Sequence, residues 1–183
     1  VFGAGASRGC AGTIYLEKQS DVVGKGELIV NNSGGSTAYG VNTDLNGLEA
    51  VTYEFSRITL TNNANLTIGS DDILIVTNTV FYGAGGLNNG IWLFGGTLRP
   101  PPVFVYSNIF IGIGATGSTF SLATSLTIGT NAELRVDVPY VMTNDVIITA
   151  GGNLTHTANG STEAYKMNLT VNGSLTVMTG GSV

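Results

Sequence analysis

The chain repeats a short alternation of apolar and polar residues, and turns rich in Asn and Gly separate the units. The pattern is clearest at 66–68 (Leu-Thr-Ile) before 73–75 (Ile-Leu-Ile), and at 126–128 (Leu-Thr-Ile) before 134–136 (Leu-Arg-Val). Because successive side chains of a strand point to opposite faces, each unit predicts a very short strand with one apolar face.

The units recur at a nearly constant spacing in the second half of the chain. Successive units begin at Leu126, Val146 and Leu169, and their partner strands begin at Leu134, Leu154 and Leu175. Strands and turns that repeat at such an even interval are typical of stacked solenoids. We therefore predict an all-β fold, a right-handed parallel β-helix (β-solenoid) with about 20–23 residues per coil. Leu, Ile and Val would stack inside it, and Thr, Asn and Ser would lie outside.

We expect one solenoid over residues 1–183 rather than several domains. Residues 1–50 are predicted to form irregular, Gly-rich first coils, and 51–183 the main solenoid. The aromatic and Gly-rich stretch at 81–102 breaks the period and is predicted to be an excursion. Both ends of the chain fall in mid-pattern, which favours a segment of a longer repetitive protein.

The low charge of the chain argues against some classes of binding partner. Only 10% of the residues are charged, and the net charge is −5. Seven basic residues spread along the chain do not make a phosphate-tracking face, so nucleic acid is not an expected partner. No apolar stretch is long enough to cross a bilayer, so membrane insertion is not expected either. The single cysteine allows no internal disulfide.

Two stretches carry a resemblance to a known class of protein. Residues 151–183 (GGNLTHTANGSTEAYKMNLTVNGSLTVMTGGSV) and the opening AGTIYLEKQ followed by GELIVNN resemble segments of large, repetitive, secreted bacterial surface proteins with β-helical repeats. The resemblance implies an extracellular or cell-surface location and a stalk, an adhesin shaft or a filament subunit. The uncapped ends predict self-association, by end-to-end stacking or with neighbouring repeats of the same parent chain, and surface glycans are further candidate partners.

The leading functional prediction is thus a structural or interaction role, and the alternative is a carbohydrate-binding or polysaccharide-cleaving β-helix. No catalytic constellation is recognisable, so no catalytic residue, no cofactor and no enzyme activity are predicted. Asp71 and Asp72 are adjacent at a turn and therefore point to opposite faces of an extended chain. Ca²⁺ stays an alternative for them, although it needs six or more oxygen ligands. Glu133, Asp137 and Asp145 are interpreted as solvated turn residues.

Aromatic residues crowd the irregular middle of the chain. Tyr82, Trp92, Phe94 and Tyr106 are candidates for contact with a sugar ring or a partner protein. The alternative, which we favour, is that these rings fill the interior of a distorted coil. His156 is the only histidine, so we expect no transition-metal site around it and place it at an ordinary rung position.

Six Asn-x-Ser/Thr sequons are candidate glycosylation sites. They begin at Asn31, Asn65, Asn153, Asn159, Asn168 and Asn172. In a eukaryotic or archaeal secreted protein they would carry glycans. The alternative is that they are turn residues, because asparagine tolerates left-handed backbone angles and bonds its own backbone.

Overall fold

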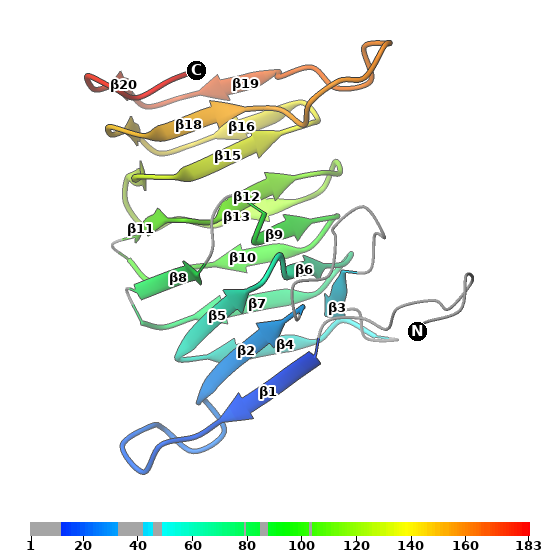
Figure 1. The fold of residues 1–183 in the computed structure, drawn as a ribbon, viewed down its shortest axis with the longest axis vertical. Helices are drawn as coiled ribbons and strands as arrows, with labels where there is room; N and C mark the ends of the chain where they lie inside the picture. The colour runs from blue at the N-terminus through cyan, green and yellow to red at the C-terminus, as the bar shows by residue number, and fades with distance from the viewer. Residues whose placement is uncertain (1–11, 33–41, 46–48, 79, 85–87, 103) are drawn as a thin grey trace, which may run out of the picture.

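A computed structural model describes residues 12–32, 42–45, 49–78, 80–84, 88–102 and 104–183. Every regular element among these residues is a β-strand, and the strands stack along one axis as a β-solenoid (Figure 1). The described part of the chain contains no helix that is long and apolar enough to cross a membrane. The predicted fold class, an all-β solenoid of stacked parallel strands, is confirmed.

The strands belong to three long sheets and one short one. Sheet A has eight strands: β1 (Gly12–Leu16), β2 (Glu27–Asn31), β5 (Arg57–Thr61), β8 (Val80–Ala84), β11 (Phe104–Ser107), β14 (Leu126–Ile128), β17 (Val146–Ile148) and β20 (Leu175–Val177). Sheet B has six: β3 (Thr43–Leu45), β6 (Asn65–Ile68), β9 (Gly90–Leu93), β12 (Phe110–Ile113), β15 (Ala132–Val136) and β18 (Gly152–Thr155). Sheet C has β4 (Thr52–Phe55), β7 (Ile73–Val76), β10 (Thr97–Arg99) and β13 (Thr119–Phe120), and the short sheet D has β16 (Tyr140–Met142) and β19 (Leu169–Val171).

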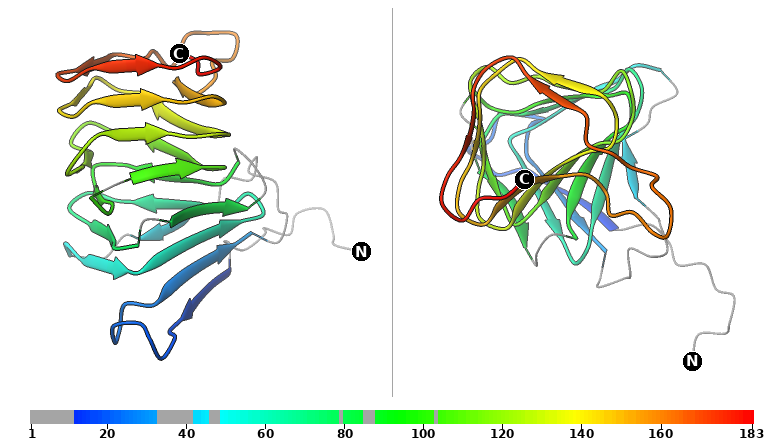
Figure 2. Two further views of the ribbon diagram at one scale, coloured as in Figure 1. Left: turned by 90° about the vertical axis from the view of Figure 1, so that its left-hand side faces the viewer. Right: turned by 90° about the horizontal axis from the view of Figure 1, so that it is seen from above.

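Each circuit of the chain contributes one strand to sheet A, the next to sheet B, and a third to sheet C or D. From β2 onward every strand pairs in parallel with strands of neighbouring coils, as the predicted solenoid requires. Seen from above, the coils superpose around a common axis (Figure 2). The exception is β1, which pairs antiparallel with β2 at the N-terminal end of the stack.

The ladder register shows how regular the coils are. In the second half of the chain, Leu126 pairs with Val146 of the next coil, as the repeat spacing predicts. The following coil is longer, because Val146 pairs with Leu175 and not with Leu169. Leu169 instead pairs with Tyr140 on another sheet.

The extra length comes from residues 156–168, which leave the ladders between β18 and β19 and project from the side of the stack (orange in Figure 1). The described residues of the stretch at 81–102, expected as an excursion, instead supply most of β8 and all of β9 and β10, which pair in parallel with neighbouring coils. Three strands therefore continue the solenoid through this Gly-rich stretch.

The core is made of columns of apolar side chains that point into the coil. One column on sheet B pairs Leu66, Ile91, Ile111, Leu134 and Leu154 in sequence. The first four are fully buried and the last is 1% exposed. Because each coil covers the next, this burial continues along the axis, at roughly 25 cal/mol for each Å² of apolar surface removed from water.

The corner between sheets A and B needs left-handed backbone angles in successive coils. Asn62, Asn108 and Asn131 have φ of 56°, 55° and 52°, and Gly151 and Gly180 have φ of 75° and 82° there. Asparagine and glycine are the residues that adopt this region at least cost. Asn131 Nδ2 also donates to Asn108 Oδ1 across one coil at 3.3 Å. From Asn108 to Gly180 the Asn/Gly turns of successive coils therefore form a continuous column.

Candidate functional site

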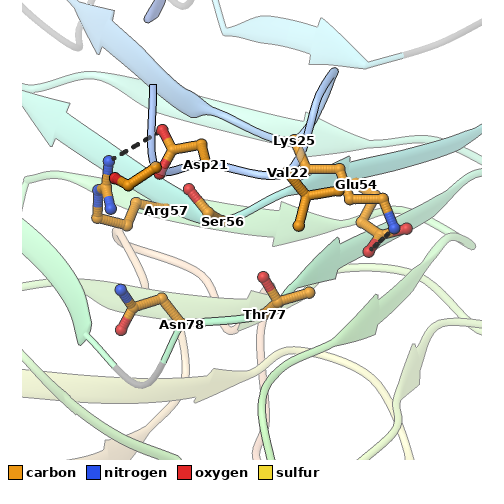
Figure 3. Close-up of a pocket in the computed structure, with 9 residues that line it drawn as sticks. Asp21, Val22, Lys25, Glu54, Ser56, Arg57, Thr77 and Asn78 are labelled. Carbon is orange, nitrogen blue, oxygen red and sulfur yellow. Dashed lines mark hydrogen bonds and ion pairs between the residues drawn. The ribbon is translucent and has the colours of Figure 1, made fainter. Parts of the chain in front are cut away.

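A polar pocket lies beside the first coils, where the chain turns into sheet A (Figure 3). Its volume is about 540 Å³. The residues that line it are Ser20, Asp21, Val22, Lys25, Glu54, Ser56, Arg57, Thr77 and Asn78. Two ion pairs are drawn within it: Arg57 Nη2 lies 3.6 Å from Asp21 Oδ2, and Lys25 Nζ lies 2.7 Å from Glu54 Oε1.

The charges of this pocket balance and hold neighbouring coils together. Arg57 Nε lies 3.4 Å from Glu27 Oε2, and Thr59 Oγ1 donates to Glu27 Oε1 at 2.6 Å. Arg57 and Thr59 belong to β5 and Glu27 to β2, so these contacts cross the ladder. The charged groups of the pocket therefore already link the strands around it.

A second feature is a cluster of aromatic rings on the outer face of sheet B, formed by Trp92, Phe94 and Phe110. In β9 the flanking Ile91 and Leu93 are buried in the core, so Trp92 between them points outward. The Trp92 and Phe94 ring centroids are 5.7 Å apart with planes 26° apart. Trp92 and Phe110 centroids are 5.2 Å apart in an edge-on arrangement.

Glycines of the adjacent strand make room for these rings. Trp92 pairs with Gly112, and a Cβ built on Gly112 would lie 2.2 Å from Trp92 Cε3. In the opposite direction Phe110 pairs with Gly90, where a Cβ would lie 2.2 Å from the Phe110 ring. The two ring-over-glycine contacts therefore interlock β9 and β12, because neither glycine tolerates a side chain while the rings stay in place.

Polar groups continue the outer face of sheet B next to the rings. Arg135 Cζ lies 4.0 Å from the centroid of Phe110, within the range of a cation–π contact. Arg135 Nη2 is 2.7 Å from Glu133 Oε2, and Asn153 Nδ2 donates to Glu133 Oε1 at 3.3 Å. Ring surface and a charge-balanced set of donors and acceptors thus lie side by side across four coils, on β9, β12, β15 and β18.

The four aromatic residues predicted to contact a ligand occupy different environments. Phe94 is 41% exposed and Trp92 is half-buried, so both offer ring surface to solvent. Tyr106 is fully buried and stacks on Phe104 with centroids 5.6 Å apart, so it is a core residue and not a surface contact. Tyr82 belongs to β8, and its side chain lies outside the described residues.

Burial isolates the hydroxyl group of Tyr106 and changes its pKa. Its hydroxyl has no hydrogen-bond partner in the described part of the chain. Desolvation raises its pKa well above the usual value of 10.0, and the charge of Glu133 adds to the effect.

The adjacent Asp71 and Asp72, considered from sequence for Ca²⁺, have different structural places. Asp72 is buried, and its Oδ1 accepts from the backbone N–H of Val51 at 2.9 Å. Asp71 sits at φ 67° in the turn before β7. Within the ranges that the structure describes, no group of three or more His, Cys, Asp or Glu side chains is placed to hold a metal ion.

Three other carboxylates, interpreted from sequence as solvated turn residues, also connect coils. Besides the Glu133 contacts, Asp137 accepts from the backbone N–H and the hydroxyl of Thr157, both at 2.7 Å. Asp145 Oδ1 accepts from the backbone N–H of Ser174 at 2.7 Å. Each of these partners lies one coil further along the chain. His156 precedes Thr157 in the chain and is half-buried, and its Nδ1 lies 2.8 Å from the carbonyl oxygen of Thr157.

The six sequon asparagines divide by exposure. Those at 159, 168 and 172 are exposed at the C-terminal end of the stack, and those at 31, 65 and 153 are half-buried within the ladders. Asn159 has an evident structural task, because its side chain donates to the carbonyl of Tyr165 at 2.8 Å. Its Oδ1 accepts from the N–H groups of Ala164 and Tyr165 at 2.8 and 2.7 Å. Asn153 accepts from Ser182 Oγ at 2.9 Å, in addition to its bond with Glu133.

Sequence reasoning missed Phe110, Glu133 and Arg135 as members of the outer cluster. A signal for Phe110 was present, because it lies one coil after Gly90 and pairs with it, just as Gly112 lies one coil after Trp92. An aromatic residue and a glycine one period apart therefore indicate a ring lying across the neighbouring strand.

Comparison of the chain with protein-family models, with curated proteins and with solved structures found no match.

Proposed function

We propose that the chain is a structural segment of an extracellular surface protein, of the kind that forms a stalk, an adhesin shaft or a filament, and that it associates by stacking coil on coil. The parallel ladders support this role, because they run along one axis and would make a stiff rod. A surface of Thr, Asn and Ser with few charges supports a place outside the cell.

One observation carries the stacking part of the proposal. Leu175 and Val177 of β20 pair with Val146 and Ile148 of β17, which are both fully buried. The same inward positions in β20 are 45% and 46% exposed. In addition, β20 is the last strand of sheet A among the described residues, so its outer edge is a template for another strand. A further coil with the same rung spacing would cover both side chains and pair with this edge.

The test is the oligomeric state of the chain as a function of concentration. We expect assemblies in light scattering coupled to size-exclusion chromatography, and rods in electron micrographs. Val177→Asp should weaken assembly at least tenfold, because it places a charge in the contact. The matched control is Val141→Asp in β16, at an apolar position that is 54% exposed on the outer side of a coil and not at either end of the stack. A chain that stays monomeric throughout, or a V177D variant that assembles like the control, would contradict the stacking proposal.

A further inference from the structure

We infer that the outer face of sheet B around Trp92 and Phe94 is a binding site for a neutral glycan chain. The site is the aromatic cluster defined above together with Arg135, Glu133 and Asn153 beside it. It goes beyond the proposed structural role, because a shaft needs no aromatic surface on its outside.

The exposed rings are held in place by the backbone beneath them. Trp92 lies across Gly112, and Phe94 lies across Gly114, where a Cβ would be 2.5 Å from Phe94 Cε1. Phe110 packs against Trp92 and is itself only 2% exposed. The Trp92 and Phe94 rings therefore form a preorganised apolar surface, and little side-chain entropy would be lost when a ligand covers it. Sugar rings present C–H groups that pack on such aromatic surfaces.

The polar neighbours match hydroxyl groups rather than a charged ligand. Arg135 already contacts Glu133 and Phe110, so the local charge is balanced. Glu133 and Asn153 supply oxygen acceptors, and Arg135 and Asn153 supply N–H donors, which is the mixture that sugar hydroxyls use. Burying an unmatched ligand charge on this neutral surface would be unfavourable.

The size of the patch argues against a protein partner or a second copy on this face. A stable protein interface buries roughly 800 Å² and about 20–30 residues on each partner. Here the exposed apolar surface comes from two rings, Trp92 and Phe94, and the rest of the outer face of the sheet carries polar residues such as Asn153 and Thr155. A narrow glycan chain lying across the rungs needs no more than this.

The test uses the fact that Trp92 is the only tryptophan of the chain, so its fluorescence reports from the site itself. The full chain is titrated with cellohexaose, xylohexaose and chitohexaose as neutral probes and with a galacturonic acid hexamer as the anionic probe. We expect a saturable change in Trp92 emission with at least one neutral hexasaccharide, and at least tenfold weaker binding of the acid. Isothermal titration calorimetry should give the same affinity.

Phe94→Ala should weaken binding at least tenfold while leaving the circular dichroism spectrum unchanged, because Phe94 is on the surface. Tyr165→Ala is the matched control, since Tyr165 is also exposed (38%) but lies in the 156–168 loop. It should bind like the unmodified chain. The inference is overturned if no neutral probe changes the emission up to millimolar concentration, if Phe94→Ala binds as well as the control, or if the emission changes only with protein concentration, which would place a second copy on the rings. These outcomes do not depend on the result for Val177→Asp, which tests the stacking of coils and not the binding of a glycan.

Discussion

Replacing Gly112 with alanine tests the ring-over-glycine contact that joins β9 to β12. The added Cβ would lie 2.2, 2.3 and 2.8 Å from three atoms of the Trp92 ring. Non-bonded carbon atoms prefer about 3.5–4.0 Å, so the ring has to move outward by about 1 Å or more. Movement of that size weakens the contacts of Trp92 with Phe94 and Phe110, at 5.7 and 5.2 Å between centroids.

The two aromatic pairs are each worth about 0.5–1.5 kcal/mol, so their loss costs about 1–3 kcal/mol. Alanine in a strand regains roughly 0.5–1 kcal/mol relative to glycine. The steric effect is larger, and we expect Gly112→Ala to lower the free energy of unfolding by about 1–2 kcal/mol. For a chain of this length that corresponds to a fall in Tm of about 2–8 °C. Thermal unfolding followed by circular dichroism measures it, and the Trp92 emission should shift to the red.

Gly160→Ala is the control, because a Cβ there meets nothing within 4 Å, and its effect should stay within about 0.5 kcal/mol. In a Trp92→Ala background, Gly112→Ala should no longer destabilise, since the clashing ring is gone. The reasoning is refuted if Gly112→Ala melts at or above the temperature of the unmodified chain with unchanged emission.

Three further predictions concern buried and bridging polar groups. Tyr106→Phe should raise the free energy of unfolding by about 1 kcal/mol at neutral pH, because it removes a buried hydroxyl with no hydrogen-bond partner among the described residues. Because the folded-state pKa of Tyr106 is raised, only the unfolded chain loses the Tyr106 proton as the pH rises above 10. The free energy of unfolding should therefore fall with rising pH by up to about 1.4 kcal/mol per pH unit, and by less in Tyr106→Phe. Urea unfolding between pH 9 and pH 11 measures both slopes. Asp137→Ala should lower the free energy of unfolding by about 1–3 kcal/mol in urea, because the N–H and hydroxyl of Thr157 both lose their acceptor. Glu163→Ala, at an exposed position, is the control and should change this free energy little. Equal effects of the two substitutions would contradict the bridging role of Asp137.

The repeat period could be read from the sequence because inward positions carry the same kind of residue coil after coil. For this reason the repeat correctly predicts that Leu126 and Val146 pair. The same repeat predicts Leu169 as the next partner of Val146, whereas the structure pairs Val146 with Leu175. Both candidates begin the same Leu-Thr-Val triplet, and only the space occupied by residues 156–168 distinguishes them. Periodicity alone does not show how much chain loops out of a coil.

The candidate site was harder to predict for a related reason. Gly90 and Gly112 lower the apparent strand tendency of the 81–102 region and its neighbour, but in the fold their missing side chains are replaced by rings from the adjacent coil. Which aromatic residues lie outside depends on strand phase: Trp92 is on the outer face, whereas Tyr106 is inside. That phase follows from register with neighbouring strands, which a single sequence gives only once its period is known.

The side loop at 156–168 gives the solenoid a tolerance of insertion that its ladders lack. Between β18 and β19 the chain departs from the stack and returns to it, and Asn159 closes the loop internally through its bonds to residues 164 and 165. Because no ladder pairing governs this connection beyond Thr157, which Asp137 holds, its length and composition can change there while the coils on either side keep their places. A foreign peptide grafted into it would be displayed at one fixed position along the solenoid axis.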